Sequence, residues 1–191
     1  MLKENINKKL DKIIPKISKD DFLEMKGLAN EIAFYIFDYE PKEEKNVEEH
    51  IPKIIKHFNY EGSRRKIIQI NLYEILIKNL KKDNILEKIF EIQKNTKKEQ
   101  FYEMLKNYAR KELFTNEIKT QSIKYDIIFI TGVSHIYPVI KSHELLTKLH
   151  EEIGDRKPVV LFYPGKFTGD ELTAFHKNKK HNYYRARPLV D

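Results

Sequence analysis

Apolar residues in this chain fall into two kinds of pattern, short continuous runs and longer stretches with helical spacing. The runs at residues 126–131 (Asp-Ile-Ile-Phe-Ile-Thr) and 158–163 (Pro-Val-Val-Leu-Phe-Tyr) are apolar at successive positions. Runs of this kind are typical of parallel strands that are covered on both faces. Residues 138–152, between them, carry apolar side chains at helical spacing. Strand, helix and strand together predict a βαβ unit with a right-handed crossover.

The first half of the chain predicts two further strands. Residues 33–37 (Ala-Phe-Tyr-Ile-Phe) form one apolar run, and residues 66–72 (Lys-Ile-Ile-Gln-Ile-Asn-Leu) form another that leads directly into a helix over residues 74–80. The first of these strands ends in the polar sequence Asp-Tyr-Glu-Pro at residues 38–41. In a parallel sheet this ending falls at the carboxyl edge, where open α/β folds bind ligands.

Two helices with internal prolines accompany these strands. An amphipathic helix over residues 3–17 opens the chain and is disturbed by a proline near its end. A second helix covers residues 46–58, with Asn46 and Glu49 as a capping pair at its start. Because Pro52 lies inside this pattern, we expect a kink there or a helix that begins later.

Residues 83–122 differ from the rest of the chain, because they show helical periodicity and no strand signal. Thr96 and Glu99 form a capping pair within this segment. Lysine is dense here, but the lysines are interleaved with the apolar stripe, which favours a solvated helix face over a nucleic-acid surface. We expect a helical insertion between the second and third strands.

The carboxyl-terminal residues predict a short helix, a basic loop and an edge strand. Thr168 and Glu171 are expected to cap the helix, which bears Leu172. Residues 176–182 form the basic loop. Residues 183–189 alternate as an edge strand does, and the proline near their end fits such a position.

These elements predict an α/β fold. We expect a largely parallel sheet of about five strands with helices on both faces, and the helical insertion 83–122 beside it. At 191 residues, the chain 1–191 is expected to form a single domain.

Composition adds limits on compartment and partners. The chain has no apolar run long enough to span a bilayer, no signal-peptide core and no cysteine, so we expect a cytoplasmic protein without disulfides or thiolate zinc sites. A formal charge of +7 would suit an acidic partner such as DNA. However, 30 of the 36 basic residues are lysine and alanine is rare, a bias that codon usage explains as well.

The motifs do not assemble into a recognisable active site. Gly165-Lys166 with Thr168 resembles a fragment of a phosphate loop, but the preceding glycine and the adjacent Ser or Thr are missing. His143 and His150 are seven residues apart, about 10 Å along a helix, which is too far for both to bind one ion. We therefore expect no cofactor, no metal and no catalytic residue.

Four phrases occur in a characteristic order in the second half of the chain. They are Phe-Ile-Thr-Gly-Val (129–133), Tyr-Pro-Val-Ile-Lys-Ser-His-Glu-Leu-Leu (137–146), Leu-Phe-Tyr-Pro-Gly-Lys-Phe-Thr-Gly-Asp-Glu-Leu (161–172) and Asn-Tyr-Tyr-Arg-Ala (182–186). They resemble the BrxB family, and residues 27–39 resemble its opening phrase. The resemblance implies a small protein encoded in a BREX phage-defence operon. It also implies partners: the phosphatase-like PglZ, a large ATPase and a DNA methyltransferase.

Several polar residues are expected to gather near the strand ends, where they could form a shared surface for a partner or a ligand. Lys141 stands where the family commonly has arginine, and lysine keeps the charge but loses the flat two-pronged donor. The glycines and the proline at these ends, Gly132, Pro164 and Gly165, are equally well explained as residues that fix turns. The candidates are Thr131, Ser134, Lys141, His143, Lys166, Tyr183 and Arg185.

The leading hypothesis is a non-enzymatic adaptor of a BREX-type antiphage system that binds a PglZ-like protein and possible further BREX components. Two alternatives stay open. One is a DNA-binding accessory subunit that uses the basic loop and the lysine-rich helices. The other is a degenerate nucleotide-binding domain. A homodimer is compatible with each of them.

Overall fold

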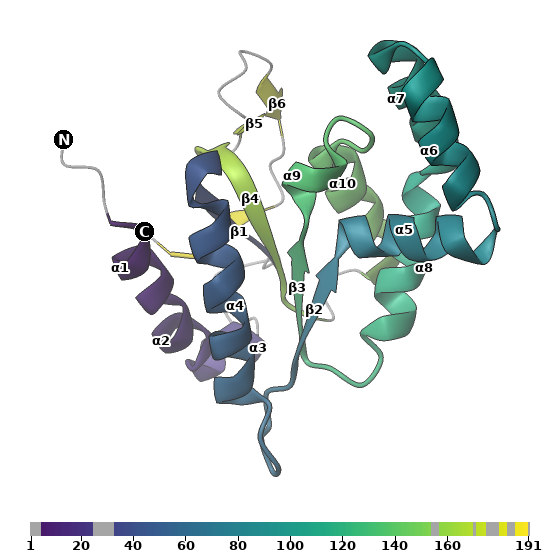
Figure 1. Cartoon of the computed structure of the whole chain (residues 1–191). Coiled ribbons are helices and arrows are strands. Elements are labelled where there is room, and N and C mark those ends of the chain that lie inside the picture. Colours follow the sequence, from purple (N-terminus) through teal and green to yellow (C-terminus); the bar gives the residue numbers. More distant parts are fainter. Residues whose placement is uncertain are drawn as a thin grey trace.

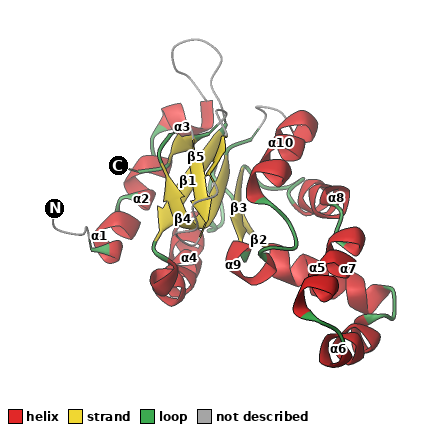
Figure 2. Ribbon diagram, turned by 90° about the horizontal axis from the view of Figure 1, so that it is seen from above, coloured by secondary structure: helices red, strands yellow, loops and turns green. Residues whose placement is uncertain are grey.

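The structure is a computed structural model, and it describes residues 5–24, 33–153, 157–169, 171–174, 180–182 and 186–190. A mostly parallel sheet stands between two layers of helices (Figure 1; Figure 2). This arrangement confirms the α/β fold expected from the sequence. The helical insertion between the second and third strands is confirmed as well.

The main sheet has the strand order β2-β3-β4-β1-β7, and every neighbouring pair in it is parallel. Two short strands, β5 and β6, extend β4 in antiparallel fashion. The bounds are β1 Phe34–Tyr39, β2 Ile67–Asn71, β3 Ile127–Thr131, β4 Val159–Phe167, β5 Glu171–Ala174, β6 Lys180–Asn182 and β7 Arg187–Pro188. The four long strands coincide with the four apolar runs.

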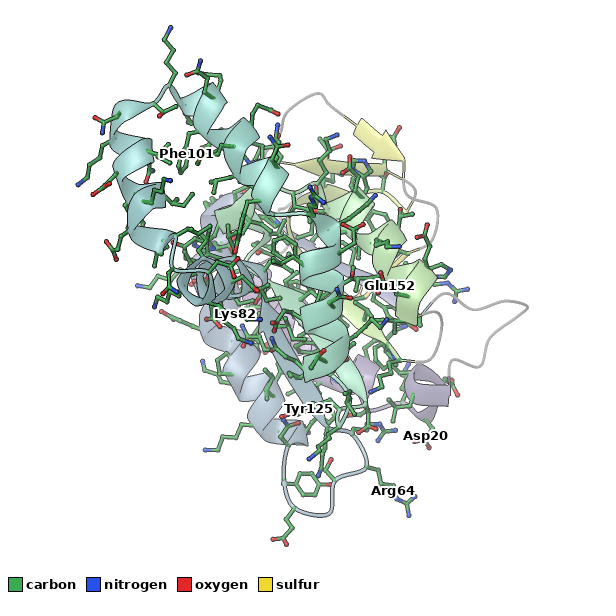
Figure 3. The ribbon with its side chains drawn as sticks, turned by 90° about the vertical axis from the view of Figure 1, so that its right-hand side faces the viewer. Asp20, Arg64, Lys82, Phe101, Tyr125 and Glu152 are labelled. Atoms are coloured by element: carbon green, nitrogen blue, oxygen red, sulfur yellow. The ribbon has the colours of Figure 1, made fainter. Side chains whose placement is uncertain are left out.

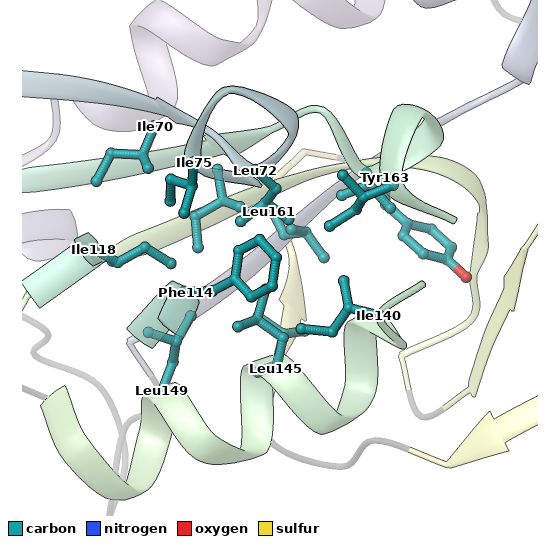
Figure 4. Packing of buried hydrophobic residues seen from close by; sticks show 14 of the residues in the cluster. Ile70, Leu72, Ile75, Phe114, Ile118, Ile140, Leu145, Leu149, Leu161 and Tyr163 are labelled. Atoms are coloured by element: carbon teal, nitrogen blue, oxygen red, sulfur yellow. The ribbon is translucent and has the colours of Figure 1, made fainter. Parts of the chain in front are cut away.

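Alternate residues of the central strands face opposite helix layers. On β1, Phe34 and Ile36 belong to one core cluster, whereas Tyr35 and Phe37 belong to the other. The cluster that contains Phe34 packs against α5 Leu72–Lys82, α8 Lys111–Gln121 and α10 Ser142–Ile153 (Figure 4). The cluster that contains Phe37 packs against α1 Ile6–Asp11, α2 Ile13–Ile17, α3 Asp20–Glu24 and α4 Glu44–Phe58.

The predicted helix over residues 46–58 begins earlier than expected. The short 3-10 helix η1 Pro41–Glu43 leads into α4 at Glu44, so Asn46 lies inside the first turn and its side chain donates to Glu43 instead of capping the helix. Pro52 lies in the helix interior, and its side chain is exposed. The backbone carbonyl that loses its hydrogen-bond partner at Pro52 can bind water instead. The helix can therefore include Pro52 and does not have to begin after it.

The amino-terminal helix is divided, as its proline suggested. The break falls at Lys12, between α1 and α2, and Pro15 occupies the first turn of α2, where a helix needs no backbone N–H.

Two further capping predictions were wrong. Thr96 has extended backbone angles at the end of α6 Leu86–Asn95, and α7 Lys98–Tyr108 begins after Lys97 without a side-chain cap. Residues 171–174 form β5 rather than a helix, because the chain reverses at Gly169, whose φ is +99°, and pairs back onto β4. Within the predicted basic loop, residues 180–182 form β6.

The predicted edge strand is shorter than expected within the described residues. Its described part is β7, which pairs with β1 at the edge of the sheet, and Pro188 lies opposite Ile36 in that pair. This is the kind of position that proline tolerates.

The insertion 83–122 consists of α6, α7 and α8, and it contains no strand, as predicted. Helix α8 packs against α10 and α5, whereas α6 and α7 extend away from the sheet as a helical lobe (Figure 1; Figure 3). Phe101, labelled in Figure 3, is buried in this lobe, and most lysines on α6 and α7 are exposed. The lysines therefore form a solvated face.

We predict that Gly132→Ala lowers the free energy of unfolding by about 2–4 kcal/mol, measured by urea denaturation. Gly132 has a φ of +76°, and a Cβ there would lie 2.1 Å from Oδ1 of Asn71, the side chain that caps α5. Gly62→Ala is the matched control, because Gly62 has a similar φ of +82° but open space around it. It should cost only about 1 kcal/mol. Equal losses in the two variants would contradict the packing argument.

Candidate functional site

The carboxyl ends of the parallel strands meet at one edge of the sheet, which is the upper edge in Figure 1. Strand β1 leads there into η1 and α4, β2 into α5, and β3 through Gly132 into the short helix α9 Val133–Ile136. Helix α10 begins at the same edge. Ligands of open α/β folds bind at this position, so it is where candidate residues must be compared.

Gly132 and Gly165, two of the glycines at this edge, are packed against the chain itself. The Asn71 side chain fills the space beside Gly132 while it accepts hydrogen bonds from the backbone N–H groups of Tyr73 and Glu74, at 2.9 and 3.4 Å. A Cβ on Gly165 would lie 2.3 Å from the backbone oxygen of Thr173 on β5. These glycines therefore permit close packing of neighbouring segments.

Thr131 and Ser134, the two hydroxyl candidates, have different environments. Thr131 is only 4% exposed, and its hydroxyl accepts a hydrogen bond from the Gln69 amide at 3.2 Å. This buried hydrogen bond links β3 to β2, so Thr131 has a structural role in the sheet. Ser134 is half-buried, and it donates to Oε1 of Glu44 at 2.9 Å while Nδ1 of His135 lies 3.2 Å from the same hydroxyl.

Ser134 thereby joins a group of polar side chains that we call the α4–α9 cluster, made of Glu44, Glu48, Ser134 and His135. One ligand atom from each of Glu44, Glu48 and His135 lies within 4.8 Å of the others. The His135 ring also lies 5.8 Å from the ring of Tyr73 on α5. The cluster thus joins residues from two separate elements at the edge of the sheet.

Burial raises the pKa of Glu44, and the neighbouring Glu48 carboxylate raises it further. The hydroxyls of Ser134 and Tyr39 and the imidazole of His135 offset part of this rise. Burial, followed by the charge of Glu44, raises the pKa of Tyr39 well above its ordinary value, so this phenol stays protonated. The cluster therefore holds a partly buried carboxylate that lacks a full counter-charge.

Lys141 and His143 lie at the start of α10. The exposed Lys141 ammonium donates to Glu144 at 2.8 Å, and this interaction holds the pKa of Glu144 below its usual value. The side chain of His143 is 23% exposed, and its Nε2 lies 3.9 Å from the same carboxylate. Lys141, His143 and Glu144 thus form a small ion-pair group, which shares no residue with the α4–α9 cluster.

Lys166 is exposed on β4 and lines a cavity of about 580 Å³. Asp38 also lines this cavity. Its carboxylate accepts hydrogen bonds from Lys9 of α1 and from the backbone N–H of Phe167. The other charged residues of the wall are Lys42, Glu40 and Glu43. Acidic and basic groups alternate here, so the cavity has no single sign of charge.

Tyr183 and Arg185 lie outside the described residues. Sequence patterns missed Glu44, Glu48 and His135, although two signals were present. The two glutamates are four residues apart just after the first strand, and His135 follows Ser134 just after the third. Ser134 and Glu44 are 90 residues apart in the sequence, and no spacing rule relates residues at that separation, so their contact could not be predicted.

Comparisons with known proteins identify the family. A model of the family described as "BREX protein BrxB" matches residues 68–189. A BREX protein BrxB of Bacillus cereus (strain H3081.97) is 38% identical to this chain over 194 residues, which cover 97% of this chain and 98% of that protein. The chain belongs to the BrxB family.

A second relative extends the match to another organism. The BREX protein BrxB of Escherichia coli O9:H4 (strain HS) is 29% identical over 184 residues, covering 95% of this chain and 90% of that protein. The resemblance inferred from the four phrases is therefore confirmed, and this BrxB family member is a BREX-system component. No solved structure gives a significant match. Among the described residues, no helix is long and apolar enough to cross a bilayer.

We predict that the stability difference between Glu44→Gln and the wild type depends on pH. A carboxyl group whose pKa is raised on folding destabilises the folded state above that pKa, and this cost disappears when both states are protonated. The variant should therefore gain stability relative to the wild type, by no more than about 1 kcal/mol, as pH rises from 4 to 7.5. Urea denaturation in buffer with a chelator measures this difference. A pH-independent difference would contradict the assigned burial of Glu44.

Proposed function

We propose that this BrxB family member is a non-enzymatic adaptor that binds other BREX proteins, with the PglZ-like protein as its first partner. We further propose that the contact surface lies at the carboxyl edge of the parallel sheet. Both relatives are BREX proteins, which supports membership in a system of several components.

The observation that carries this proposal is the packing of Gly132 and Gly165. In nucleotide-binding α/β proteins, glycines at strand ends let a phosphate approach the backbone. Here the space beside Gly132 is filled by Asn71, and the space beside Gly165 is filled by the backbone of Thr173. Because the chain itself fills the space beside both glycines, a phosphate cannot approach the backbone there. Such an edge is better suited to present a surface to a partner than to enclose a nucleotide.

Tyr73 is the strongest anchor for a partner at this edge. Its side chain is 41% exposed, and it lines an open groove of about 420 Å³ on α5 together with Ile77 and Lys78. Tyrosine is enriched among the residues that dominate binding energy, because it combines a large apolar area with a hydroxyl. Among the sequence candidates, Lys141 and Lys166 are exposed near the same edge and are proposed as polar contacts.

We predict that Tyr73→Ala lowers the capture of the PglZ-like protein at least about tenfold. The tagged full chain is co-expressed with the other proteins of its operon, and the captured partner is quantified after affinity purification. Tyr60→Ala is the matched control, because Tyr60 is an exposed tyrosine, at 62%, that follows α4 at the opposite edge of the sheet. It should capture as much partner as the wild type.

Two outcomes would contradict the proposal. One is failure of the wild-type chain to capture any operon protein under conditions where the others assemble. The other is a loss in Tyr60→Ala that equals the loss in Tyr73→Ala, which would move the surface elsewhere.

The charge distribution favours a protein partner over DNA for the helical insertion. Residues 83–122 contain eight basic and seven acidic residues, so their charges nearly cancel. Phosphate binding needs a patch of one sign, and it weakens steeply with salt through counterion release. A salt-sensitive shift of duplex DNA near physiological ionic strength would therefore count against the adaptor proposal.

A further inference from the structure

The α4–α9 cluster has the composition and the position of a metal site. Glu44 and Glu48 lie one turn apart on α4, and His135 approaches them from α9. Each offers one ligand atom, and the three atoms lie within 4.8 Å of one another. Two carboxylates and one imidazole form a donor set that suits divalent transition metals.

Ser134 orients two of the three donors. Its hydroxyl donates to Oε1 of Glu44 and lies 3.2 Å from Nδ1 of His135. Because the Ser134 proton goes to Glu44, this contact is satisfied by an N–H on Nδ1, and in that tautomer the lone pair that could bind an ion lies on Nε2. Contacts that fix a ligand's ring in this way are a regular feature of metal sites in proteins.

The surroundings of the Glu44 carboxylate independently favour a bound cation. Its second oxygen, Oε2, is buried and makes no hydrogen bond of ordinary geometry among the described residues, although the nearby Tyr39 hydroxyl lowers the pKa of this carboxyl group. No described lysine or arginine forms an ion pair with Glu44 or Glu48; Lys45, on the same helix, pairs with Glu49 instead. A buried carboxylate oxygen without a donor is costly, and a bound cation would remove that cost.

We propose that Glu44, Glu48 and His135 bind one divalent transition-metal ion of the zinc class. The donors of a tetrahedral zinc ion are separated by about 3.4 Å, so no separation among the three must shorten by more than about 1.4 Å. Glu48 and His135 are exposed, and their side chains can make this adjustment. Three protein ligands leave the fourth position for water.

The consequence for the fold is a link between α4 and α9. Helix α4 covers one face of the sheet, whereas α9 contacts α5 on the other side and the end of β4. An ion bound by both helices would hold the two layers together at the carboxyl edge. Because the ion binds only the folded chain, it must stabilise the fold in proportion to its concentration.

We predict that Zn²⁺ raises the Tm of the chelator-treated full chain by about 5 °C or more at a free concentration about 100 times its Kd, whereas Mg²⁺ does not. Mg²⁺ prefers oxygen ligands and retains its water, so it tests the contribution of the imidazole. Titration calorimetry should give one zinc ion per chain. An equal response to Mg²⁺, or no shift with Zn²⁺, would overturn the assignment.

Matched variants distinguish this site from the other histidines of the chain. Glu48→Gln and His135→Gln should each weaken zinc binding at least about tenfold, and both residues are exposed, so neither variant endangers folding. Glu49→Gln and His57→Gln are the controls. They change exposed residues of α4 that lie outside the cluster, so both variants should bind zinc as the wild type does. Binding that survives in the first pair would place the ion elsewhere. Since the measurement uses the isolated chain, its outcome is independent of partner capture.

Discussion

The central strands of this protein are apolar on both faces, and each face must be covered. Successive residues of β1 alternate between two core clusters, and β3 is buried at all five positions. Two helix layers are the direct consequence, because neither face can be left in water. The same requirement places the polar side chains of β1 and β3, Asp38 and Thr131, near the strand ends, which is the edge where we propose the contact surface.

At the carboxyl edge, polar residues first secure the fold. Asp38 binds Lys9 of α1 through one carboxylate oxygen and the backbone of Phe167 through the other, so that an amino-terminal helix and the end of β4 are tied to β1. Asn71 caps α5 and packs beside Gly132 at the same time. Side chains with two structural partners have little freedom to take a third. Tyr73, Lys141 and Lys166 are exposed near this edge, and the adaptor proposal assigns recognition of a partner to them.

Residue patterns predicted the four long strands because strands covered on both faces are largely apolar, whereas β5 was expected to be a helix and β6 a loop. Short polar patterns were less informative. A Ser, Thr or Asn followed three residues later by Glu predicted three helix starts, at Asn46, Thr96 and Thr168, and none of them caps a helix. At Thr168 the deciding feature was Gly169, whose positive φ turns the chain into a hairpin, and Leu172 is then buried as a strand residue.

The α4–α9 cluster illustrates why sites are harder to predict than folds. Histidine spacing on one helix was a sound test for a chelating pair, but it examines only neighbours in sequence. Glu44 follows β1 and His135 follows β3, and these strands are not adjacent, since β4 lies between them. Their side chains meet because α4 begins above the sheet and α9 turns back over the same edge. The strand order therefore determines which polar residues can cooperate, and strand order is the property that a parallel α/β sequence encodes least directly.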